Sequence, residues 1–190
     1  MSENDVRVLS LMVSCVAAVI TLLAAYRGRI AAKQTRELQI LGLVRQYHTD
    51  LRTWADEAVN VLSRTALLCE LDPARMVEGM FFNLRHDLRS QLSALIDRGR
   101  WFLPNKTPEA YGPAKPMAFR GFRDAALDAL VHSLRILEAL NYQEKASNAE
   151  KREVIIESKR TFVNEIQETL DPRSWVSDIA SLRASVMKAS

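Results

Sequence analysis

Between Ile40 and Leu68 the chain reads ILGLVRQYHTDLRTWADEAVNVLSRTALL. Mostly apolar residues recur here at alternating spacings of four and three, namely Ile40, Val44, Tyr47, Leu51, Trp54, Ala58, Val61, Thr65 and Leu68. This pattern is the a/d seam of a heptad repeat and predicts a long amphipathic helix. The seam can pack on later helices of the same chain or pair with another copy, and we expect packing within the chain for most of it.

An uncharged segment precedes this helix. Residues Val8 to Tyr26 form a run of 19 residues that would extend roughly 29 Å as a helix, about the thickness of a hydrocarbon core. We therefore predict a transmembrane helix at 8–26, in preference to a secretory signal peptide or a buried core helix. No proline occurs between Met1 and Asp72, so this helix can continue into the heptad helix, with Gly28 and Gly42 as its weak points.

The charged residues that follow the segment predict its orientation. The basic residues on its C-terminal side are Arg27, Arg29, Lys33 and Arg36. The positive-inside rule then makes them a basic anchor at the inner leaflet, in contact with membrane lipids. We expect a single-pass protein of the inner membrane, with residues 1–7 outside and residues 27–190 forming a cytoplasmic domain.

The later chain predicts an all-α bundle of about four or five helices. Asp72-Pro73 ends the heptad helix, a second helix follows from about Ala74 to Arg98, and Gly99 marks its end. A Pro-rich loop spans 103–116, and a third helix is expected from about Met117 to Tyr142 with Phe119 and Phe122 buried. Ser147 and Glu150 form a capping box for the fourth helix, and Asp171-Pro172 ends it before a short last helix that bears Trp175, Ile179, Leu182 and Val186.

Catalytic motifs are missing from the sequence. The three histidines, His48, His86 and His132, are not spaced with cysteines or carboxylates as a metal site requires. The six glycines do not form a nucleotide-binding loop, and no serine lies in a nucleophile elbow. We therefore expect no cofactor, no metal and no enzymatic activity. Two cysteines in 190 residues are typical of a reducing compartment.

The most unusual composition lies between Arg85 and Arg123. Eight basic residues stand there against three acidic ones, and five aromatic residues are interleaved with them. Such a mixture can bind anionic lipid, RNA or another anionic ligand, and the candidate residues are Arg98, Arg100, Arg120 and Arg123. Alternatively the aromatic residues pack on the bundle while the cations face water, and we favour this structural interpretation.

Small residues on the apolar segment predict self-association. Ser10, Ser14 and Ala18 follow one another at four-residue steps, and Thr21 lies on a second such face. Narrow faces of this kind let helices pack closely, so we expect a homo-oligomer in which these four residues form a packing or pore face.

The stretches Arg98–Asn105, Gly112–Pro116 and Phe119–Arg123 resemble those of uncharacterised bacterial single-pass, membrane-anchored α-helical proteins. In layout alone the chain is also similar to the pore-forming membrane effector associated with an RNA-targeting CRISPR enzyme. That resemblance implies an oligomeric pore and a divergent HEPN ribonuclease bundle. The HEPN pattern, an arginine and a later histidine with four to six residues between them, is missing here.

Together these observations favour a non-enzymatic, self-assembling inner-membrane protein, an antiviral or stress effector that alters membrane permeability. The alternatives are a membrane-tethered scaffold for a cytoplasmic protein partner, and an RNA-binding or degenerate HEPN-like protein.

Overall fold

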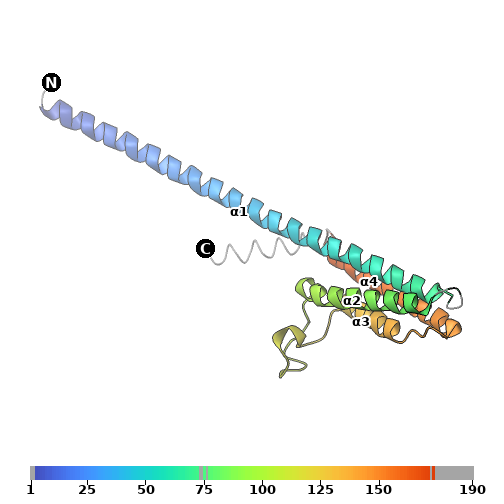
Figure 1. Cartoon of the computed structure of the whole chain (residues 1–190). Coiled ribbons are helices and arrows are strands. Elements are labelled where there is room, and N and C mark those ends of the chain that lie inside the picture. Colours follow the sequence, from blue (N-terminus) through green and yellow to red (C-terminus); the bar gives the residue numbers. More distant parts are fainter. Residues whose placement is uncertain (1–2, 73–74, 76, 172, 174–190) are drawn as a thin grey trace. The chain divides into compact units, whose positions relative to one another are not determined.

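The computed structural model describes residues 3–72, 75, 77–171 and 173 (Figure 1). Its helices are α1 (Glu3–Glu70), α2 (Glu78–Phe102), α3 (Ala125–Glu138) and α4 (Lys145–Leu170), with a short 3-10 helix, η2 (Met117–Phe119), before α3. The described residues contain no strand, only one isolated antiparallel bridge between Lys106 and Phe122. The predicted all-α fold is confirmed for this part of the chain. The expected last helix after Pro172 lies outside the described residues.

Two compact units divide the chain, and their boundary falls within α1. Unit 1 comprises residues 1–48, and its described part is the N-terminal portion of α1 alone. Unit 2 comprises residues 49–190 and holds the rest of α1 together with α2, η2, α3 and α4. The predicted continuation of the apolar segment into the heptad helix is observed, since α1 runs through Gly28 and Gly42 without a break.

The predicted transmembrane helix at 8–26 must be corrected. Among the described residues, no helix combines the length and the apolar character needed to cross a membrane. The inner-membrane localisation was based on this helix and is contradicted with it.

The core of unit 2 forms around the second half of the heptad seam. Its a and d residues are almost completely buried, namely Leu51, Trp54, Ala58, Val61, Thr65 and Leu68. The indole Nε1 of Trp54 donates to the Leu95 carbonyl of α2 at 3.0 Å, and the ring lies 5.6 Å from that of Phe162 on α4. The seam therefore packs within the chain from Leu51 onward, as predicted.

α2 extends beyond its predicted end. Gly99 was expected to terminate it, but the helix continues through Gly99 to Phe102. A Cβ at Gly99 would lie 2.4 Å from Leu127 Cδ2 and 2.5 Å from Trp54 Cζ2, so this glycine lets three helices approach one another. α2 also begins later than expected, at Glu78. Its cap is Val77, which contributes no side-chain bond and is 76% exposed.

The segment between α2 and α3 is irregular, as predicted for 103–116, but the irregularity extends to residue 124. The backbones of Lys106 and Phe122 exchange two hydrogen bonds of 2.8 Å. Gly121 adopts φ +79° beside them, where a Cβ would lie 2.2 Å from the Lys106 carbonyl oxygen. Phe119, the last residue of η2, is 48% exposed and Phe122 is 57% exposed, so their predicted burial in a long helix that starts at about Met117 is wrong.

Local capping explains where the last two helices begin. The carboxylate of Asp124 accepts a hydrogen bond from the Ala126 N–H at 3.1 Å, which sets the start of α3. α4 begins at Lys145 after Glu144, so the predicted capping box at Ser147 is wrong. The predicted end of α4 is confirmed, because the helix stops at Leu170 immediately before Asp171. α3 packs against both α2 and α4.

Candidate functional site

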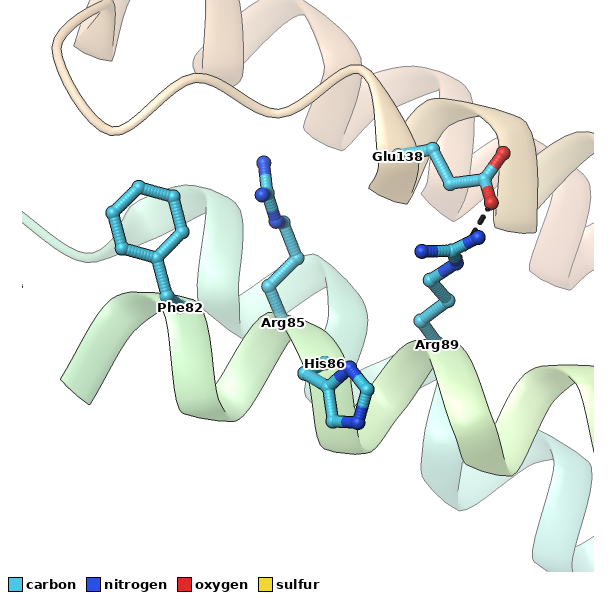
Figure 2. Close-up of a pocket in the computed structure, with 5 residues that line it drawn as sticks. All are labelled: Phe82, Arg85, His86, Arg89 and Glu138. Carbon is cyan, nitrogen blue, oxygen red and sulfur yellow. Dashed lines mark ion pairs between the residues drawn. The ribbon is translucent and has the colours of Figure 1, made fainter. Parts of the chain in front are cut away.

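An open depression of about 410 Å³ lies where α2 faces the end of α3. Figure 2 shows Phe82, Arg85, His86 and Arg89 projecting from α2, with Glu138 of α3 across from them. Their spacing of three and four residues puts the α2 side chains on one helix face. Two arginines, a histidine, a phenylalanine and a glutamate therefore line this hollow.

The two arginines of this depression already have intramolecular partners. Arg85 Nη1 donates to the Leu140 carbonyl at 2.7 Å, and its guanidinium lies 5.0 Å from the Phe82 ring. Arg89 Nε lies 2.8 Å from Glu138 Oε1, the ion pair drawn in Figure 2. An anion entering here would compete with a carboxylate and a carbonyl. The arrangement therefore attaches α3 to α2 and offers no strong anion site.

Metal and thiolate chemistry lack support in the described residues. No group of three or more His, Cys, Asp or Glu side chains that could hold a metal ion occurs among them, and this includes the surroundings of His86. Burial raises the pKa of the Cys69 thiol to about 11, so the sulfur remains protonated at neutral pH. Its Sγ donates to the Thr65 carbonyl at 3.4 Å within α1.

The four arginines predicted to bind an anionic ligand are each engaged within the chain. Arg98 forms an ion pair with Glu57 at 2.7 Å, and Arg123 forms one with Asp128 at 2.6 Å. Arg120 Nε donates to the Lys115 carbonyl at 2.6 Å. The guanidinium of Arg100 lies 4.6 Å from the Phe119 ring. These contacts agree with the structural interpretation of the region, and ligand binding by these residues stays a prediction.

Neighbouring residues of the same loop are also paired. Lys106 Nζ lies 3.1 Å from Asp124 Oδ2, and this hydrogen bond raises the pKa of the lysine. The rings of Tyr111 and Phe122 stack with their centres 5.8 Å apart, and Lys115 Nζ lies 4.7 Å from the Tyr111 ring. Aromatic and cationic side chains of the loop therefore bind one another.

The described part of unit 1 contrasts with unit 2, because its apolar residues are exposed. From Ala17 to Leu43 every described side chain is exposed except Ile40, which is half-buried. The large apolar members are Val19, Ile20, Leu22, Leu23, Tyr26, Ile30, Leu38, Leu41 and Leu43. We call this set, together with the seam residues Ile40, Val44 and Tyr47, the α1 apolar surface. Exposed large apolar side chains in this number on one helix are typical of a protein interaction site.

The residues that were predicted to face a membrane or a pore also belong to α1. Arg27, Arg29, Lys33 and Arg36 are exposed, as are Ala18 and Thr21. The Thr21 hydroxyl donates to the Ala17 carbonyl at 2.8 Å and is thus used within the helix. The side chains of Ser10 and Ser14 lie outside the described part of the structure. Helix packing by these small residues stays a prediction.

No family model matches the chain, and no curated protein or solved structure is similar to it. The resemblance to bacterial membrane-anchored proteins and to the CRISPR-associated effector therefore stays a prediction.

Proposed function

We propose that this chain is a non-enzymatic, self-assembling helical protein that associates through the α1 apolar surface. The observation that carries the proposal is the exposure of nearly every described side chain from Ala17 to Leu43, leucine, isoleucine and valine included. Burial of such side chains between copies contributes about 25 cal/mol for each Å² of apolar surface removed from water.

Helix stability gives the second support. Helices in water obtain most of their stability from packing of an apolar face, because intrinsic propensity contributes little. The described part of unit 1 consists of one helix and has no second element within the unit to cover that face. Association with other copies supplies the missing contacts. An antiviral or stress role, a scaffold role and RNA binding stay predictions.

The proposal predicts that polar substitutions on this surface abolish assembly. In a triple variant, Leu23→Gln, Ile30→Gln and Leu41→Gln, glutamine keeps helix propensity while removing the apolar contacts. Light scattering should give the native chain a mass that is a multiple of 21.5 kDa and give the variant the mass of a single chain.

A matched control carries the same number of glutamines on exposed apolar positions of unit 2, at Leu67, Met80 and Val154. This control should assemble like the native chain. Equal masses for the native chain and both variants would show that the α1 apolar surface does not mediate assembly.

A further inference from the structure

The aromatic side chains of the segment between α2 and α3 lie outside the buried core of unit 2. Tyr111, Phe119 and Phe122 are each about half exposed, and Met117 among them is 80% exposed. Ion pairs account for most cations of this region, but burial against the helices does not account for these apolar side chains. Large apolar side chains gathered in one exposed segment are typical of a protein interaction site.

Hydrogen bonds hold this segment in a defined shape. The Tyr111 carbonyl accepts from the Gly121 N–H at 2.9 Å, which closes residues 111–121 into a loop. Inside it the Pro116 carbonyl accepts from the Phe119 N–H at 2.8 Å. A partner that binds a surface held in this way loses little entropy in ordering it. We call the following side chains the loop surface: Tyr111, Lys115, Met117, Phe119, Arg120 and Phe122.

The loop surface also carries positive charge that has no carboxylate partner. Its segment contains four cationic residues against one acidic residue, Glu109. Lys106 and Arg123 pair with carboxylates at the start of α3. Among the described residues, no carboxylate forms an ion pair with Lys115 or Arg120. These two cations are therefore available to an acidic partner.

A protein fits the loop surface better than a nucleic acid does. Nucleic acids are bound through several phosphate contacts together with open ring faces on which bases stack. The loop surface has only two cations, and the Tyr111 and Phe122 rings stack on each other. By contrast, the cores of protein interfaces are enriched in aromatic residues, methionine and arginine. All three occur here.

We propose that the loop surface binds a segment of another protein in which apolar side chains stand next to carboxylates. The apolar side chains cover Met117, Phe119 and Phe122, and the carboxylates pair with Lys115 and Arg120. Within the described structure Arg120 donates only from Nε, to the Lys115 carbonyl, and keeps both Nη groups for a carboxylate. The site shares no residue with the α1 apolar surface, so it does not depend on self-assembly.

Selection from a random library tests the chemistry of the partner. Short random peptides displayed on phage are selected on the intact chain, and those that also bind the double variant Lys115→Glu and Met117→Gln are removed. The peptides that remain should combine acidic with apolar residues. If no peptide remains, or if those that remain lack acidic residues, the proposal is overturned.

Single variants then separate the charge from the apolar contact. Lys115→Arg keeps the charge and should bind the recovered peptides with native affinity, while Lys115→Gln and Met117→Gln should each weaken binding by about three- to tenfold. The matched control is Met80→Gln, the same substitution at an exposed methionine of α2, which should bind like the native chain. Equal losses in Met80→Gln and Met117→Gln, or in Lys115→Arg and Lys115→Gln, would contradict recognition by the loop surface.

Oxidation of the native chain tests the location without any substitution. Dilute hydrogen peroxide converts exposed methionine to its sulfoxide, and mass spectrometry measures each site. A saturating peptide should slow oxidation of Met117 by at least about fivefold and leave Met80 unchanged. Protection of Met80 alone, of both equally or of neither would place the peptide elsewhere. Protection of Met117 by a single-stranded RNA in place of the peptide would assign the surface to nucleic acid and overturn the proposal.

Discussion

At the scale of single residues, Gly99 shows how a glycine determines helix packing. It lies inside α2, where glycine is about 1 kcal/mol less favourable than alanine. Glycine is needed at this position because Trp54 of α1 and Leu127 of α3 occupy the space that a side chain would fill, and their close packing offsets the cost. The Trp54 ring also lies 5.8 Å from that of Phe102, three residues further along α2.

Gly99→Ala should therefore destabilise unit 2. The added methyl overlaps two fully buried side chains, and overpacking of this kind costs about 1–3 kcal/mol in the free energy of unfolding. Chemical denaturation followed by circular dichroism measures the change. The control is Gly79→Ala at the start of the same helix, where no atom lies within 4 Å of the added Cβ.

The control variant should be neutral or stabilising by up to about 1 kcal/mol. If Gly99→Ala is as stable as Gly79→Ala, the three helices do not approach one another as closely as the structure shows.

At the scale of elements, a buried amide attaches the first turn of α4 to the preceding turn. Asn148 is 2% exposed, and its side chain forms hydrogen bonds with both backbone groups of Asn141. Its Nδ2 donates to the Asn141 carbonyl at 2.7 Å, and its Oδ1 accepts from the Asn141 N–H at 3.2 Å. This pairing fixes where the chain turns from α3 into α4.

Asn148→Ala should lower the free energy of unfolding by about 1–3 kcal/mol, because two partly buried backbone groups of Asn141 lose their partners. Thermal unfolding measures the loss. Ser147→Ala is the matched control and should change stability little, since Glu144 and not Ser147 is the N-cap of α4. A larger loss in Ser147→Ala than in Asn148→Ala would reinstate the capping box and contradict this assignment.

Helix ends and helix starts differ in how far the sequence predicts them. The ends of α1 and α4 follow from local Asp-Pro signals, and the burial of Leu51 to Leu68 follows from heptad spacing. The start of α4 follows Glu144, which forms no side-chain cap bond, so no capping motif in the sequence marks it. The group of residues around Arg85 is also non-local, because its partner carbonyl at Leu140 lies 55 residues away.

Aromatic residues and the apolar segment show two further limits of sequence patterns. Phe119 and Phe122 repeat with helical spacing, yet they lie in the segment between α2 and α3, where the Lys106–Phe122 bridge and contacts with Arg100 and Tyr111 hold them. The uncharged run at 8–26 shows that this segment is hydrophobic, but it does not show whether the side chains contact lipid or protein. The described part of α1 contradicts the membrane-spanning interpretation.

At the scale of the whole molecule, one heptad frame has two uses. From Leu51 onward its apolar residues form the core of unit 2. From Ala17 to Tyr47 the described large apolar side chains of α1 are exposed, apart from the half-buried Ile40 and Val44, and we propose that a second copy covers them. The proposed homo-oligomer rests on the exposure of these apolar side chains in the described part of unit 1, which consists of one helix.

The most direct measurement is backbone amide hydrogen exchange of the intact chain at two protein concentrations, with 51–69 as internal reference. If a second copy covers α1, exchange in residues 22–48 should slow by roughly threefold for a tenfold rise in concentration, because the free fraction of a dimer falls with the square root of total concentration. Exchange in 51–69 should not change. Equal exchange in 22–48 at both concentrations, in a chain that remains monomeric, would contradict self-assembly through α1.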